Sequence, residues 1–232
     1  MAVWFFPLSS QKGEIMNNTN YSPSEVLDLW FPDSGHQNDI STHAAFWEER
    51  MQGGMDARII ANFSGLTTAA ASGLLDHWAD TPRGRLALLI ALDQFPRSLW
   101  RDTPAAFGQD IKATRLALEG IQNGDFAGLA SWEQTFFAIA IGHCEGPDHL
   151  ERMQNLTSVV QGIVDNMPGP LTERSSRLIA QHARVMGVIE RFGRHPHRNP
   201  IYGRLSTPEE EAYIAEGDFP HLKKKTKDVG GG

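Results

Sequence analysis

The segment RFGRHPHRNP, residues 191–200, concentrates groups that bind anions and carry protons. Arg194 and Arg198 offer planar guanidinium donors that match carboxylate and phosphate oxygens, and Asn199 adds an amide. An unperturbed imidazole titrates near neutral pH, so His197 is a candidate proton carrier. The two prolines of the segment restrict the backbone, so we expect a stiff loop that holds these side chains outward.

A second chemical group lies in RLALLIALDQFPRSLWR, residues 85–101. Apolar residues occupy the whole circumference of this helical stretch, which is typical of a helix buried on all sides. Asp93 therefore needs a cation or several N–H donors, or it must carry a raised pKa. Arg97 and Arg101 follow at successive helical turns. The pair of Asp93 and Arg97 either locks the helix end or belongs to a site.

A third group ends the apolar helix in SWEQTFFAIAIGHCEG, residues 131–146. His143 continues the apolar stripe of this helix, and Glu145 follows it closely. These two residues fit an acid–base pair or metal ligands, or a satisfied core histidine. Cys144 fits an inert buried thiol. As the single cysteine of the chain it forms no intramolecular disulfide, so we expect a reducing, cytoplasmic location.

We predict that these helix ends converge in one polar pocket for a small anion of carboxylate or phosphate type. The predicted catalytic residues are Asp93, His143, Glu145 and His197. The predicted ligand-binding residues are Arg97, Arg101, Arg194, Arg198 and Asn199. A histidine would carry the proton, a carboxylate would orient it, and the arginines would hold the anion.

Two other interpretations stay open. The arginines fit the groove of a non-enzymatic interaction module that binds an acidic peptide, or they are structural partners of buried carboxylates with no ligand. The net charge of −7 argues against nucleic acid as a partner, and no apolar run approaches the roughly 18 residues of a membrane helix. No His-x3-His spacing predicts a metal site, and no motif identifies a cofactor.

Capping signals predict an all-helical domain. Ser22-Pro23 begins the series, and Thr-Pro pairs at residues 81, 103 and 207 repeat it before further helical stretches. We expect about eight to ten helices in a tetratricopeptide-like array. They lie near residues 23–31, 43–51, 55–63, 66–79, 82–94, 104–119, 132–143, 147–165, 172–192 and 208–215. Residues 21–220 form this domain, residues 1–20 a disordered or artificially added extension without a signal peptide, and residues 221–232 a disordered basic tail.

Several of these motifs resemble the "domain of unknown function 924" family of bacterial and eukaryotic proteins. The resemblance rests on LDQFPR at 92–97, on His143 and Glu145, on RFGR and PHRN within 191–199, and on the stretch from Gly203-Arg204 to STPEE at 206–210. It covers roughly residues 22–220. It implies an all-helical, tetratricopeptide-like fold and no established activity.

The chain also departs from the pattern of that family. The family usually has His-Arg-Asp where this chain has Val185-Met186-Gly187, phenylalanine at His195 and serine at Cys144. Histidines stand instead at 182 and 195. Either the site has been rebuilt with relocated imidazoles, or the scaffold has been kept and its original chemistry lost.

Overall fold

The computed structural model describes residues 20–220, and this part of the chain is helical with no β-strand. The α-helices are α1 (Pro23–Trp30), α2 (Ile40–Met51), α3 (Asp56–Asn62), α4 (Ser64–Ala71), α5 (Pro82–Asp93), α6 (Phe95–Leu99), α7 (Asp110–Gln122), α8 (Ser131–His143), α9 (His149–Asp165), α10 (Thr172–Phe192), α11 (Asn199–Tyr202) and α12 (Pro208–Glu216). Short 3-10 turns lie between them, among them η1 (His36–Asn38), η2 (Asp76–Asp80), η3 (Pro104–Phe107) and η6 (Pro196–Arg198). The all-helical prediction is confirmed. The predicted basic tail and all but Asn20 of the predicted extension lie outside the described residues.

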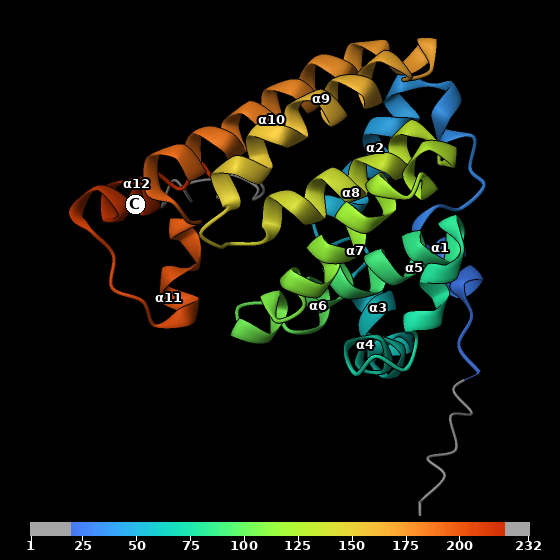
Figure 1. Cartoon of the computed structure of the whole chain (residues 1–232), viewed down its shortest axis with the longest axis horizontal. Coiled ribbons are helices and arrows are strands. Elements are labelled where there is room, and N and C mark those ends of the chain that lie inside the picture. Colours follow the sequence, from blue (N-terminus) through green and yellow to red (C-terminus); the bar gives the residue numbers. More distant parts are fainter. Residues whose placement is uncertain (1–19, 221–232) are drawn as a thin grey trace, which may run out of the picture.

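Many of the helices pack against a neighbour in the chain, as α7 does against α8, α8 against α9 and α9 against α10. Figure 1 shows α9 and α10 as a long antiparallel pair along one side, with α8 and α7 beside them and α5 further in. Helix α5 contacts α1, α4, α7 and α8, so it forms the centre of the molecule. Helices α11 and α12 lie at one end of the α9–α10 pair (Figure 1). This is a helical array, and its tetratricopeptide-like character stays a prediction.

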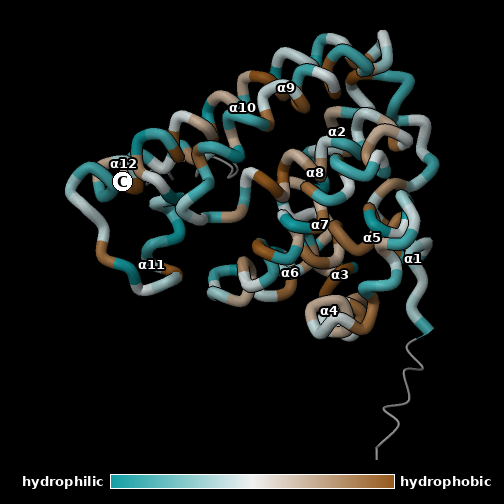
Figure 2. Tube along the Cα trace, in the orientation of Figure 1, coloured by the Kyte–Doolittle hydropathy of each residue, from teal (hydrophilic) through white to brown (hydrophobic). Residues whose placement is uncertain are grey.

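Helix α5 is buried beyond its first two residues, as its uniform apolar pattern predicts. Every residue from Gly84 to Asp93 is buried, and Figure 2 shows hydrophobic residues gathered on α4 and α5. Thr81 starts the helix by accepting a hydrogen bond from the Gly84 N–H at 3.1 Å. Asp93 therefore ends the buried part of the helix, which starts at Gly84, and α6 follows almost at once.

Two predicted helices have different bounds because glycines and 3-10 turns interrupt them. The helix predicted over residues 66–79 ends at Ala71, since Gly73 has φ of +82° and the chain then forms the turn η2. The Thr103-Pro104 cap begins the short turn η3, and α7 starts only at Asp110. By contrast, α10 spans Thr172–Phe192 as predicted and ends at Gly193 with φ of +68°.

The segment 191–200 does not form the outward-facing loop that its prolines suggested. It folds into the end of α10, the turn η6 and the start of α11. His195, Arg198 and Asn199 are 1%, 3% and 0% exposed, respectively. The side chains turn inward because Arg198 meets a carboxylate from another helix, Asp110.

Among residues 20–220, no helix combines the length and apolar character that crossing a bilayer needs.

Candidate functional site

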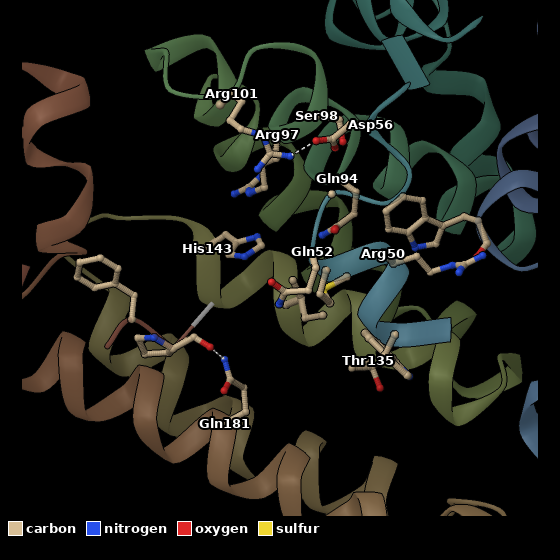
Figure 3. Close-up of a pocket in the computed structure, with 18 of the residues that line it drawn as sticks. Arg50, Gln52, Asp56, Gln94, Arg97, Ser98, Arg101, Thr135, His143 and Gln181 are labelled. Atoms are coloured by element: carbon tan, nitrogen blue, oxygen red, sulfur yellow. Dashed lines mark hydrogen bonds and ion pairs between the residues drawn. The ribbon is translucent and has the colours of Figure 1, made fainter. Parts of the chain in front are cut away.

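A cavity of about 660 Å³ lies between α2, α6, α8, α10 and η6. The predicted site residues that line it are Arg97, Arg101, His143, His197 and Arg198. Figure 3 shows Arg97 and Arg101 on one side of this cavity, Gln181 on the other, and His143 between them. The fold thus brings together residues that are up to about a hundred positions apart in the sequence.

Asp93 and His143 form a buried dyad beside this cavity. Nδ1 of His143 lies 2.8 Å from Oδ1 of Asp93, and the two residues are 6% and 1% exposed. Burial acts to raise the pKa of Asp93, but Arg97 and His143 outweigh burial and hold this pKa well below its ordinary value. Burial and Arg97 lower the pKa of His143, although Asp93 acts to raise it. The dyad therefore pairs an ionised carboxylate with a neutral imidazole, and the His143 N–H at Nδ1 donates to Asp93.

Two cavity arginines share one buried carboxylate. Asp110, the first residue of α7, accepts from Nη2 of Arg97 at 2.8 Å and from Nη1 of Arg198 at 3.1 Å. Arg97 also lies 3.2 Å from Oδ1 of Asp93. At this end of the cavity the charges of Arg97 and Arg198 are balanced by two carboxylates, Asp93 and Asp110.

His197 faces the cavity as a neutral group. Burial, with a contribution from Arg198, lowers the pKa of His197 to about 3. Its ring centroid lies 5.5 Å from that of His195 and 5.1 Å from that of Phe219. Nδ1 of His197 is buried and has no hydrogen-bond partner in the protein. Such an atom is uncommon in native proteins and is expected to meet water or a ligand.

Four predicted site residues do not line the cavity: Asp93, which lies behind His143, and Glu145, Arg194 and Asn199. Glu145 accepts from Arg204 through both oxygens, at 2.5 and 3.2 Å, and from the backbone N–H of His195 at 2.8 Å.

Arg194 donates to both oxygens of Glu210 at 2.6 and 2.8 Å, and Asn199 donates to Ser206 at 2.9 Å. These contacts, like those of Glu145, fasten residues 193–210 to each other and to the end of α8. The sequence places Glu145, Arg194 and Asn199 near helix ends, but tertiary packing determines which residues they contact.

Sequence reasoning missed a second group of cavity residues. Arg50 on α2 and Arg174 and Arg177 on α10 line the cavity, together with several aromatic side chains. Arg50 donates to the backbone carbonyls of Trp30 at 2.5 Å and of Phe46 at 3.0 Å. One signal for Arg174 was present: it continues the stripe of Leu178 and His182 toward the start of α10, at a spacing of four residues.

Within residues 20–220, no three His, Cys, Asp or Glu side chains gather in a way that would hold a metal ion.

The model of a family described as bacterial protein of unknown function (DUF924) matches residues 26–218. One solved structure, a protein of unknown function, ATU0120, from Agrobacterium tumefaciens, is similar with a TM-score of 0.62 and 28% identity. That similarity covers 84% of this chain and 97% of the other. A search of curated proteins gives no match.

Proposed function

The chain belongs to the DUF924 family of bacterial proteins of unknown function, and we propose that it binds a small organic anion, of carboxylate or phosphate type, in the cavity between α2, α6, α8 and α10. The volume of about 660 Å³ lies inside the range of roughly 300–1,000 Å³ in which proteins bind drug-sized ligands. An inorganic ion would fill a small part of it. The ligand is therefore an organic molecule that carries an anionic group.

The observation that carries this proposal is the excess of arginine over carboxylate in the cavity wall. The described lining residues with a positive charge are Arg50, Arg97, Arg101, Arg174, Arg177 and Arg198. The acidic ones are Asp56 and Asp102. Asp93 and Asp110 behind the wall balance Arg97 and Arg198, and Glu49 lies 3.0 Å from Arg50, so the excess of positive charge lies at Arg174 and Arg177. Arginine forks bind carboxylate and phosphate oxygens through paired N–H donors, and their strength increases where water is excluded.

Two buried polar atoms in the same wall support a polar ligand. Nε1 of Trp30 and Nδ1 of His197 have no hydrogen-bond partner in the protein, and both residues line the cavity. The indole N–H is only a donor, so it favours an acceptor atom on the ligand. Burying either atom without a partner costs about 1–3 kcal/mol, which a bound ligand or an ordered water would recover.

The Asp93–His143 dyad supports a second candidate function, proton transfer to or from the bound ligand. A carboxylate that accepts from Nδ1 sets the tautomer of the imidazole and leaves its Nε2 side to the substrate in many acid–base sites. His143 is a cavity residue and Asp93 lies directly behind it. In this proposal Asp93 is a positioning residue and His143 carries the proton.

Thermal unfolding with matched ligands tests the binding proposal. Benzoate, phenyl phosphate and succinate are compared with benzamide, which has a similar body and no charge, and with a hexaglutamate peptide. An anion at about a hundred times its Kd should add roughly 2.7 kcal/mol, or about 5–10 °C in Tm. Ile139→Trp fills the cavity wall and should abolish the shift, whereas Leu205→Trp, at a residue that is 92% exposed, should keep it.

Two results would overturn the binding proposal. An equal shift with benzamide and benzoate would show that the charge is not recognised. A shift with hexaglutamate alone, unchanged in the Ile139→Trp variant, would instead identify a surface that binds an acidic partner, which is the non-enzymatic interpretation of the same arginines.

The dyad has its own test in the nitrogen NMR spectrum of the imidazole rings. At neutral pH the wild-type protein should show His143 as the Nδ1–H tautomer, because Asp93 accepts from that atom. Asp93→Asn presents an amide donor, so His143 should change to the Nε2–H tautomer. The surface variant Asp28→Asn serves as the control, and a wild-type His143 in the Nε2–H form would contradict the assigned dyad.

A further inference from the structure

The two ends of the cavity differ in how their charges are balanced. At the α6 and η6 end, Arg97 and Arg198 share Asp110, and Arg97 also meets Asp93. Arg101 pairs with Asp56 at 2.5 Å. Each guanidinium at this end therefore already has a carboxylate, and an added anion would have to displace one or stand beside it.

The α10 end has cations without such partners. Among residues 20–220, the side chains of Arg174 and Arg177 form no ion pair and no hydrogen bond. Arg174 lies over the ring of Trp47, with its guanidinium carbon 5.0 Å from the ring centroid. The two arginines are three residues apart on α10, so their side chains project from neighbouring positions on one face.

The surrounding electrostatics agree with an unbalanced positive charge. Burial and the neighbouring Arg177 lower the pKa of Arg174 to about 10. Burial lowers the pKa of the nearby cavity residue His43 to about 3, with further contributions from Arg174 and His36. Positive neighbours lower the pKa of a basic group, as seen for both Arg174 and His43. An anion bound at this end would act to raise both pKa values.

Apolar and aromatic side chains line the space between the two ends. Arg174 lies over Trp47, and Arg198 lies over the Phe107 ring at 4.3 Å. The other apolar residues of the wall include Trp132, Ile139 and Leu178. Along α10 the wall runs from Arg174 to Gln181, which is about 10 Å of helix at 1.5 Å per residue. The cavity therefore has room for an apolar body between its ends.

We infer that the ligand is an amphipathic organic monoanion that lies in one direction along the cavity. Its anionic group meets Arg174 and Arg177, its flat or apolar body packs against Trp47 and Leu178, and its uncharged polar end reaches the Asp93–His143 dyad. This inference rests on the proposed function and adds to it the class of ligand and its orientation. It assigns anion recognition to α10, away from the arginines that the sequence motifs emphasise.

A pair of fluorescent probes tests this orientation. Anilinonaphthalene sulfonate has an aromatic body and one anionic group, and N-phenyl-1-naphthylamine has the same body without the charge. We expect the sulfonate to bind with one-to-one stoichiometry to the wild-type protein. Arg174→Met with Arg177→Met should raise its Kd at least tenfold, because two charge-assisted contacts are lost. The Kd of the uncharged probe should change less than twofold.

A matched control removes two cations from other surfaces. Arg115 and Arg191 are exposed and do not line the cavity, so Arg115→Met with Arg191→Met changes the net charge equally. This control should bind both probes as the wild type does. Circular dichroism and Tm are measured for each variant to show that it is folded. Weaker probe fluorescence then reflects a change in the site, and stronger fluorescence does not come from probe bound to an exposed hydrophobic core.

The possible results separate this inference from the proposed function. If the sulfonate binds and its Kd is unchanged in the Arg174 and Arg177 variant but rises tenfold in Arg101→Met, the orientation is wrong and anion binding stands. If the sulfonate binds no better than the uncharged probe to the wild type, the proposed function itself fails. If the control variant weakens the sulfonate equally, the effect comes from net charge and the inference is overturned.

Discussion

Replacing Asp110 with alanine is expected to destabilise the protein by about 3–5 kcal/mol, the cost of leaving a buried charge without its partner. Asp110 is 5% exposed and accepts from Arg97 and Arg198, and Arg198 is itself 3% exposed. Arg97 keeps Asp93 in the variant, but Arg198 keeps no carboxylate. Burial lowers the pKa of Arg198 even in the presence of Asp110, so the remaining guanidinium would be poorly solvated.

Urea unfolding measures this loss, and a double variant identifies its cause. Asp110→Leu with Arg198→Met removes both charges and should recover most of the stability, since an apolar pair of similar volume often replaces a buried ion pair at little cost. Glu119→Ala, on the exposed side of the same helix, is the matched control, because its contacts with arginine are 3.6 Å long. A loss below about 1 kcal/mol for Asp110→Ala would contradict the shared-carboxylate description.

Acid is expected to destabilise the protein well before most carboxylates titrate, because buried histidines are held neutral in the folded state. His43 and His149 are 0% and 1% exposed. Burial is the main cause that lowers the pKa of His43 to about 3 and that of His149 to about 4. Below an unfolded pKa near 6.5 the unfolded chain binds protons that the folded chain does not. Stability is therefore complete above pH 6.5 and is lost as the pH falls toward these folded values.

At pH 5 each of the two histidines should account for about 2 kcal/mol of this loss, from a difference of about 1.5 pH units at 1.36 kcal/mol per unit. Urea unfolding at pH 7.5, 6 and 5 gives the slope. His149→Gln keeps a donor for the Gly142 carbonyl that Nε2 of His149 reaches at 3.1 Å. It should remove the share of about 2 kcal/mol that His149 contributes, while His43 and His197 keep theirs. His77→Gln, at an exposed position, should keep all of it. A flat profile from pH 7.5 to 5 would contradict the expectation.

The sequence predicts a helix correctly where residues within that helix determine its bounds and burial. The 172–192 helix carries an amphipathic stripe and a terminal glycine, and the structure has the same bounds. The helix before Asp93 is apolar all round and is buried. By contrast, the closeness of Glu145 and His143 in the chain predicts that their side chains act together. Their side chains separate because Arg204, which is far along the sequence, meets Glu145, and no local pattern specifies that pairing.

The arginines of the cavity illustrate the same limit. Arg97 and Arg198 lie in recognisable motifs, and both line the cavity. Arg174 lies outside those motifs, so sequence reasoning passed over it, although its stripe position pointed inward. Arg97 and Arg198 are neutralised in part by Asp110, and no sequence motif connects Asp110 with either of them. Charge balance is a property of the assembled helices, and the sequence alone gives only the inventory of charges.

The walls of the cavity come from almost the whole described chain, from Trp30 on α1 to Phe219 and Pro220 after α12. Gln181 on α10 donates to the Pro220 carbonyl, so the final segment is tied to the wall beside it. During synthesis, α1 to α8 leave the ribosome long before residues 219–220 exist to close the site. A cavity whose wall residues lie up to about 190 positions apart depends on non-local packing, which forms slowly. It should therefore be among the last parts of the molecule to be completed, and a ligand would stabilise only finished chains.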